Sequence, residues 1–131
     1  MSPREKYNKM ITGDRTQNDC AVIALALVTN LPYRRIEGWL EYLGRRTNRG
    51  TQMWMVRSVL AMAGFRITVR QRSVPKSVNQ CSQKLNKNKK FLVITSRHIL
   101  AVIKGEVLDW TEGRRHRPQQ VWEITRIRRS R

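Results

Sequence analysis

The stretch RTQNDCAVIALALVTN, residues 15–30, places a cysteine where a polar segment meets an apolar one. The residues just before Cys20 are polar, and all residues from Ala21 to Val28 are apolar. A cysteine at such a boundary has two interpretations. It can be a small hydrophobic residue at the start of a buried segment, or it can be a nucleophile, because the N-terminus of a helix favours a thiolate. The choice depends on the partners that the rest of the chain provides.

Two further residues supply the complementary chemistry. His98 begins the apolar run HILAVIK, and Asp109 lies near the end of the next run, EVLDW. If these runs pair as a hairpin about Lys104 and Gly105, His98 and Asp109 lie close together at its open end. A thiolate that attacks, an imidazole that transfers a proton and a carboxylate that fixes the imidazole tautomer suffice for nucleophilic catalysis. The spacing therefore predicts a Cys20–His98–Asp109 triad.

Neighbouring residues are expected to modify this chemistry. The side-chain amide of Gln17 and the backbone N–H of Cys20 are candidate donors to an oxyanion. Arg97 directly precedes His98, and a neighbouring cation is expected to lower the imidazole pKa. Asp19 disfavours a thiolate at the next position unless its carboxylate is occupied as a helix cap.

The first half of the chain has helical periodicity. The segment after Cys20 is apolar all round, which is typical of a helix buried on every side, with Asn18 or Asp19 as its N-cap. Further helices are expected over residues 32–44 and 51–64, because both segments carry apolar residues at helical spacing and end in glycine.

The period then changes to the alternation of strands. Residues 77–87 are expected to form a short, exposed helix or loop, and the last strand is expected to be a closing strand. Helices followed by an antiparallel sheet indicate one α+β domain over residues 1–131, with an N-terminal arm (1–14) and a basic C-terminal tail (126–131). The predicted strands are FRITVRQR, FLVIT, HILAVIK, EVLDW and VWEITRI.

These features resemble the papain-like cysteine proteases, in which a cysteine starts a buried helix and the histidine heads a strand. More narrowly, NDCAVIALALVTNLPY, RRTNRGT, HILAVIKGEVLDW and RPQQVWEI are similar to small bacteriophage-encoded papain-like proteins, over residues 16–124. The resemblance implies a central helix packed on a small antiparallel sheet, and thiol hydrolase chemistry on a peptide, isopeptide or other amide bond without a cofactor. It assigns Cys20 as nucleophile, His98 as base and Asp109 as the orienting carboxylate. It also implies a location in the host cytoplasm or in the virion.

The chain is strongly basic, with 27 Lys and Arg against 9 Asp and Glu and a net charge of +18. Such a charge attracts polyanions, chiefly DNA or RNA, with an acidic protein or an anionic membrane surface as weaker candidates. Contacts to phosphates without base readout are the expected mode. The candidate nucleic-acid-binding residues are Arg45, Arg46, Arg49, Lys87, Lys89, Lys90, Arg114, Arg115, Arg117, Arg126, Arg128 and Arg129.

Several classes of protein are disfavoured. No apolar run reaches the ~18 residues that a membrane span needs, and the N-terminal segment lacks the apolar run of a signal peptide, so a cytosolic location is expected. Cys20 and Cys81 do not form a disulfide framework. No Cys or His pair has zinc-finger spacing, so no metal is expected.

Two functions remain open. The first is a thiol hydrolase that acts on a peptide or protein substrate. The second is a papain-like scaffold without catalysis, which binds DNA or RNA or serves as a minor virion or ejection component, because one fold can carry unrelated functions.

Overall fold

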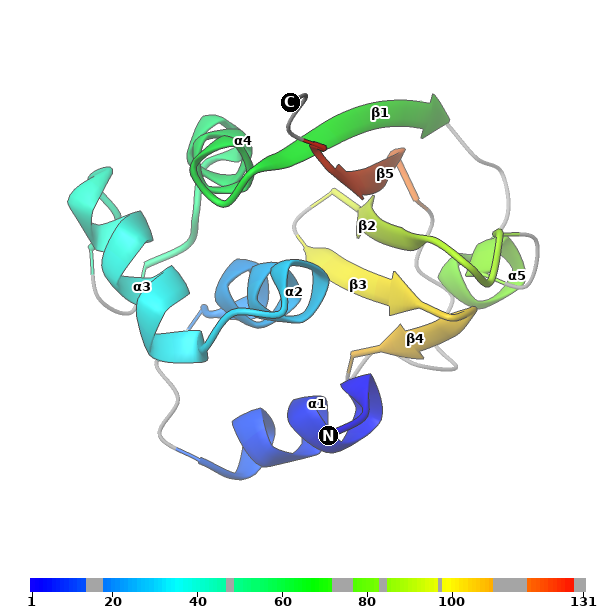
Figure 1. Cartoon of the computed structure of the whole chain (residues 1–131), viewed down its shortest axis with the longest axis horizontal. Coiled ribbons are helices and arrows are strands. Elements are labelled where there is room, and N and C mark those ends of the chain that lie inside the picture. The colour runs from blue at the N-terminus through cyan, green and yellow to red at the C-terminus, as the bar shows by residue number, and fades with distance from the viewer. Residues whose placement is uncertain are drawn as a thin grey trace.

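The computed structural model describes residues 1–13, 18–46, 49–71, 77–82, 85–96, 98–109 and 118–128. It is an α+β fold in which helices pack on a five-stranded antiparallel sheet of order β1-β5-β2-β3-β4 (Figure 1). The helices are α1 (Pro3–Thr12), α2 (Cys20–Thr29), α3 (Tyr33–Tyr42), α4 (Met53–Met62) and α5 (Val78–Ser82). The strands are β1 (Phe65–Gln71), β2 (Lys90–Ile94), β3 (Ile99–Ile103), β4 (Glu106–Leu108) and β5 (Gln120–Arg126).

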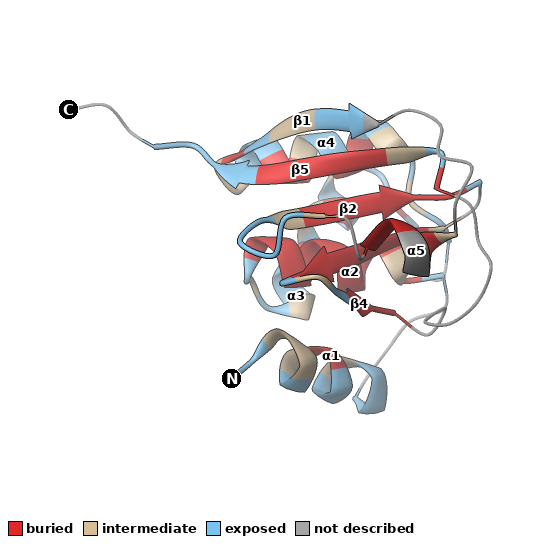
Figure 2. Ribbon diagram, turned by 90° about the vertical axis from the view of Figure 1, so that its right-hand side faces the viewer, coloured by how far each residue is buried: buried red, intermediate tan, exposed pale blue. Residues whose placement is uncertain are grey.

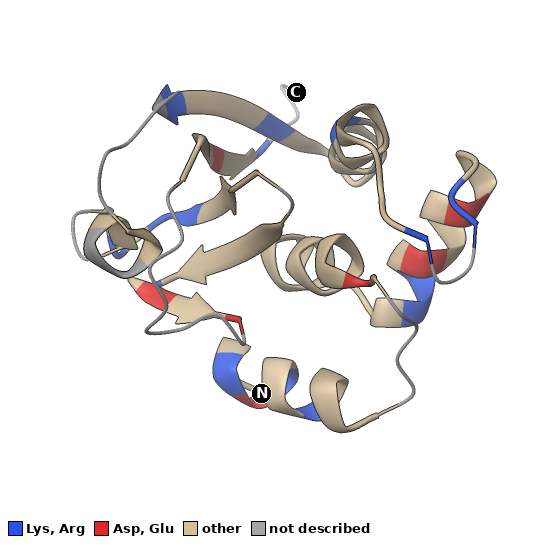
Figure 3. Cartoon of the chain, turned by 180° about the vertical axis from the view of Figure 1, so that it is seen from behind, with Lys and Arg blue, Asp and Glu red and all other residues tan. Residues whose placement is uncertain are grey.

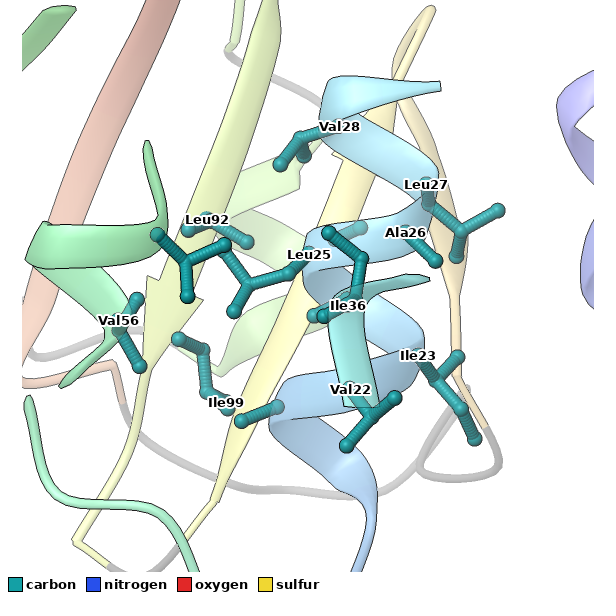
Figure 4. Packing of buried hydrophobic residues seen from close by; sticks show 14 of the residues in the cluster. Val22, Ile23, Leu25, Ala26, Leu27, Val28, Ile36, Val56, Leu92 and Ile99 are labelled. Carbon is teal, nitrogen blue, oxygen red and sulfur yellow. The ribbon is translucent and has the colours of Figure 1, made fainter. Parts of the chain in front are cut away.

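Helix α2 is the centre of the larger hydrophobic core, as its all-round apolar sequence predicts. Every residue from Ala21 to Thr29 is buried. The helix packs against β3 on one side and against α1, α3 and α4 on others. In Figure 4, Leu25 of α2 lies among Leu92 and Ile99 of the sheet and Val56 of α4. Each such side chain contributes roughly 1.5–3 kcal/mol when it leaves water.

The C-terminal carbonyls of α2 are also removed from water, and lysines from other elements bind them. Lys6 Nζ of α1 donates to the carbonyl oxygens of Ala26 and Leu31, both at 2.7 Å. Lys90 Nζ of β2 donates to the carbonyl oxygen of Val28 at 3.3 Å. Because the last carbonyls of a helix lack intrahelical donors and carry partial negative charge, cations stabilise this end.

The sheet register explains how the β3–β4 hairpin forms. Lys104 (φ 56°) and Gly105 (φ 77°) make the predicted two-residue turn, which requires positive φ at both positions. Ala101 then lies opposite Leu108, so the residues just outside the hairpin, His98 and Asp109, lie at its open end.

The outer face of the sheet carries a second, smaller core. Val78 and Cys81 of α5 pack with Leu100, Val102 and Val107 of β3 and β4. Figure 2 looks onto this face, with α5 in front of the sheet. Val78 and Cys81 are 2% and 4% exposed, so the expectation of an exposed segment is wrong for this helix, whose apolar side chains pack on the sheet.

The ends of the described chain carry regular structure that the predicted arm and tail do not include. The predicted N-terminal arm contains helix α1, which begins with a capping box between Ser2 and Glu5. The S-x-x-E pattern was the signal for it. The predicted closing strand, β5, lies inside the sheet between β1 and β2, and Arg126 belongs to this strand rather than to a tail.

None of the helices in the described part of the chain is long and apolar enough to cross a membrane.

The cap on α2 generates the first prediction. Replacement Lys6→Met should lower the free energy of unfolding by about 1–3 kcal/mol, because it leaves two carbonyl oxygens without this donor. Urea unfolding followed by circular dichroism measures the change. Lys9→Met, at an exposed position of the same helix, is the matched control and should change stability by less than about 0.5 kcal/mol. Equal losses in both variants would contradict the proposed cap.

Candidate active site

The three predicted triad residues lie together in one open cleft of about 820 Å³. Cys20 is the first residue of α2, His98 directly precedes β3 and Asp109 directly follows β4. His98 Nε2 lies 2.7 Å from Asp109 Oδ2, and Cys20 lines the same cleft, where it interacts electrostatically with the imidazole. The residue types and the hairpin spacing thus identified three residues that the fold brings into one cleft.

Each triad residue is held by rigid structure. Cys20 is anchored by the buried helix that it begins. The carbonyl oxygen of His98 accepts hydrogen bonds from the backbone N–H of Thr95, at 2.8 Å, and from its hydroxyl, at 3.3 Å. These bonds close the connection between β2 and β3 and fix the backbone of His98. Asp109 is 7% exposed at the end of the hairpin.

The electrostatics of the cleft favour a protonated imidazole. Burial alone lowers the pKa of His98, but the hydrogen bonds and negative charges of Asp109 and Cys20 outweigh it and raise the pKa to about 9 from the usual 6.5. Asp109 and Cys20 therefore set the direction of the shift, and the expected lowering by Arg97 stays a prediction. Arg97 itself lies outside the described residues.

The hydrogen bond to Asp109 also selects the tautomer. A carboxylate accepts hydrogen bonds, so in the neutral imidazole the proton resides on Nε2 and Nδ1 carries the lone pair. Nδ1 is consequently the nitrogen that can take the proton of the Cys20 thiol.

Asp19 is the N-cap residue of α2, one of the two expected positions, but its side chain does not cap the helix. Its carboxylate is 2% exposed and accepts a hydrogen bond from the Tyr33 hydroxyl at 2.9 Å. This bond ties the carboxylate to α3 and not to the first turn of α2, so the condition under which Asp19 would not oppose a thiolate at Cys20, capping of the helix, is not met. The backbone N–H of Cys20 remains a candidate oxyanion donor, whereas Gln17 lies outside the described residues.

The cleft contains glutamines that the sequence analysis missed. Gln52 Oε1 accepts a hydrogen bond from Trp54 Nε1 at 2.6 Å, and Gln120 Oε1 accepts one from Trp122 Nε1 at 2.7 Å. An indole N–H can only donate, so each amide has its oxygen fixed and its Nε2 left as a donor. The repeated Q-x-W spacing in QMW and QVW was the available signal.

The prediction that Arg45 contacts a nucleic acid is wrong. Arg45 is 3% exposed, and its Nε donates to the carbonyl oxygen of Arg49 at 3.0 Å, while Nη2 lies 3.5 Å from the carbonyl oxygen of Asn18. Its guanidinium therefore joins two segments of the cleft wall and cannot reach a phosphate on the surface.

The other basic residues have different surroundings. Lys90 is half-buried on the carbonyl of Val28, and Lys89 is exposed but pairs with Glu123 at 3.3 Å. Exposed positions among the described residues are Arg46, Arg49, Lys87, Arg126 and Arg128. Outside the described residues lie Arg114, Arg115, Arg117 and Arg129. Within the described ranges, no group of three or more metal-ligating side chains occurs.

The His98–Asp109 pair predicts a pH dependence. Because folding raises the pKa of His98, its protonation stabilises the fold fully below pH 6.5, and this contribution is lost as the pH rises through about 9. Asp109→Asn should move the His98 midpoint, followed by NMR, toward 6.5. Between pH 6 and 9 the free energy of unfolding should fall less in Asp109→Asn than in the unchanged protein, by on the order of 1–2 kcal/mol.

The matched control for this pair is Glu123→Gln, which removes another buried carboxylate. In the unchanged protein, burial raises the pKa of Glu123, but Arg70 and Lys89 outweigh this effect and lower the pKa. The Glu123 carboxylate therefore stays charged throughout this pH window. The His98 midpoint should not move in this variant. An unchanged midpoint in Asp109→Asn would contradict the role given to Asp109.

Arg45 generates a further prediction. Arg45→Met should lower the free energy of unfolding by about 2 kcal/mol, because the carbonyl oxygens of Arg49 and Asn18 lose the charged donor that the buried guanidinium provides. Arg46→Met, at the adjacent exposed position, should have an effect below about 0.5 kcal/mol. Chemical denaturation of both variants measures the difference, and equal stability would show that the buried guanidinium is not structural.

Comparisons with protein-family models, with curated proteins and with solved structures find no match to this chain.

Proposed function

We propose that the protein is a papain-like thiol hydrolase that cleaves a peptide, isopeptide or related amide bond. One observation carries the proposal: Cys20, at the N-terminus of a buried helix, shares a cleft with a histidine that is hydrogen-bonded to a buried aspartate. A nucleophile, a base and an orienting group in mutual contact are the requirements of covalent acyl transfer.

The first half of the reaction follows from the tautomer of His98. Nδ1 takes the proton of the Cys20 thiol, and the sulfur attacks the carbonyl carbon of the substrate. The resulting oxyanion accepts a hydrogen bond from the backbone N–H of Cys20, where the helix dipole adds positive potential. The side chain of Gln17 is the proposed second donor. The C–N bond then breaks, and the proton on Nδ1 passes to the leaving amine, which leaves a thioester on Cys20.

The second half reverses these roles with water. His98 Nδ1 removes a proton from a water molecule, which attacks the thioester carbonyl carbon. The C–S bond breaks, and the proton returns to the sulfur. Asp109 accepts the Nε2–H throughout, so it keeps Nδ1 directed at the reacting atoms and stabilises each imidazolium.

The wall of the cleft suggests how a substrate is recognised. Thr51, Gln52 and Gln120 provide neutral polar groups, and Met53 and Ile94 provide apolar contacts. Among the described lining residues there is no lysine or arginine. A polypeptide substrate held through its own amides by the glutamine side chains, with apolar side chains against Met53 and Ile94, fits this wall.

The arrangement of elements also supports a papain-like fold. A helix that begins with the nucleophile packs on an antiparallel sheet whose strands carry the base and the carboxylate. This is the arrangement that the sequence resemblance implies, and the fold family is part of the proposal.

The reactivity of Cys20 tests the proposal. Iodoacetamide should alkylate Cys20 at pH 6 at least tenfold faster than a peptide thiol, because a paired imidazolium favours the thiolate. His98→Ala should abolish this excess. Buried Cys81 is the internal control and should stay unlabelled in the folded protein. A slow thiol that is indifferent to His98→Ala would favour the non-catalytic scaffold.

Turnover gives the second readout of the same proposal. A set of fluorogenic peptide amides serves as substrate, and Cys20→Ala should reduce hydrolysis at least a thousandfold. Circular dichroism shows whether this variant keeps its fold. Hydrolysis that survives in Cys20→Ala would overturn the assignment of the nucleophile.

A further inference from the structure

One end of the sheet gathers basic residues from several strands. In the register, Phe65 lies opposite Arg126, and Lys90 lies opposite both Ile124 and Ile103. The start of β1, the end of β5, the start of β2 and the β3–β4 turn are therefore at the same end of the sheet. Figure 2 shows this end at the left, with exposed chain at the start of β2 and the end of β5.

This basic end is defined by six exposed residues that surround the strand termini. Lys87 packs over the turn glycine, Gly105, and Lys104 is the other turn residue. The six are Arg66, Lys87, Lys89, Lys104, Arg126 and Arg128.

Few acidic groups balance this charge. Glu123 pairs with Arg70 and Lys89, and Glu106 pairs with Arg4. The other five members of the basic end form no ion pair within the described part of the chain. Lys and Arg also occur on the helices, as Figure 3 shows, but α3 carries Glu37 and Glu41 beside its arginines.

The basic end is separate from the cleft. His98, Asp109 and Gln120 lie at the opposite end of the same strands. A five-residue strand such as β2 spans about 16 Å. A ligand at the basic end therefore leaves the cleft open.

Charge and surface chemistry favour a nucleic acid over an acidic protein as the partner. From β1 to β4 there are four strand spacings, or about 19 Å, and duplex DNA presents one charge per about 1.7 Å of its axis. A stable protein interface needs buried apolar and aromatic anchors. Near the strand termini at this end, the exposed large hydrophobic side chains are Ile127, 45% exposed, and Met62, 46% exposed at the end of α4, and neither is aromatic.

We propose that the basic end binds the phosphodiester backbone of a duplex nucleic acid, without reading its sequence. Flexible Lys and Arg side chains meet phosphates, and their binding releases counterions. This inference does not depend on the hydrolase proposal, because it uses no residue of the cleft.

Fluorescence anisotropy with a labelled 20-base-pair DNA duplex tests the surface. The full chain should bind duplexes of unrelated sequence with equal affinity, and the affinity should fall steeply as salt increases. The triple variant R66Q/K87Q/R128Q should bind at least tenfold more weakly. Its slope of log affinity against log salt should be smaller by about 2.7, because each lost phosphate contact removes about 0.9.

The matched control is K9Q/R35Q/R46Q, which removes the same charge from exposed positions on the helical side. It should lower the affinity less than threefold. Equal losses in the two triple variants would show that net charge acts without a defined surface. A larger loss in the control would place binding on the helices. Either result overturns the proposal.

Two further measurements test whether the fold is intact in the variant and whether an acidic protein could be the partner. Cys20 alkylation in R66Q/K87Q/R128Q should match that of the starting protein, which shows an intact fold and an independent cleft. Polyglutamate of 20 residues should compete with the duplex only weakly. Binding of polyglutamate without binding of the duplex would assign the surface to an acidic protein and overturn the nucleic-acid proposal.

Discussion

The complete burial of α2 is the constraint on which the rest of the structure depends. A helix with apolar residues on every side satisfies its own backbone except at its ends, so the fold must supply partners there. At the C-terminal end, Lys6 and Lys90 supply them from two different elements. The N-terminal end opens into the cleft, where Cys20 stands at the junction of core and solvent. The thiol is thereby partly exposed, while its backbone belongs to a helix that is buried along its whole length from Ala21 to Thr29.

The imidazole shows how the cleft controls charge in a protein of net charge +18. Its two partners, Asp109 and Cys20, raise the pKa of His98 even though burial opposes a charged ring. No cation lines the cleft within the described residues, so the strongest nearby interactions of the imidazole are with these two groups. The net charge of the chain therefore has little effect on the charge of the imidazole. Surface charges are screened and act weakly over distance, whereas Asp109 lies only 2.7 Å from the ring.

Local patterns in the sequence predicted the elements that carry the site. The apolar run after Cys20 and the glycine turn at Gly105 are short-range signals, and together they placed His98 beside Asp109. The position of β5 between β1 and β2 was not predictable in this way, because strand order depends on contacts between segments far apart in the chain. Arg45 shows the same limit: a basic loop residue is usually solvated, and only the assembled fold turns it inward toward Asn18 and Arg49.

The register of the sheet gives the two proposals a common geometric basis. In an antiparallel sheet each strand has one terminus at each end, so a single set of strands presents two surfaces that share a scaffold but not a ligand. A nucleic acid held at the basic end would raise the local concentration of any protein bound to the same nucleic acid. The cleft, lined by neutral amides and apolar groups, would then act on a polypeptide and not on the phosphates that retain it. Location would be set by charge at one end of the sheet, and bond cleavage by Cys20 at the other.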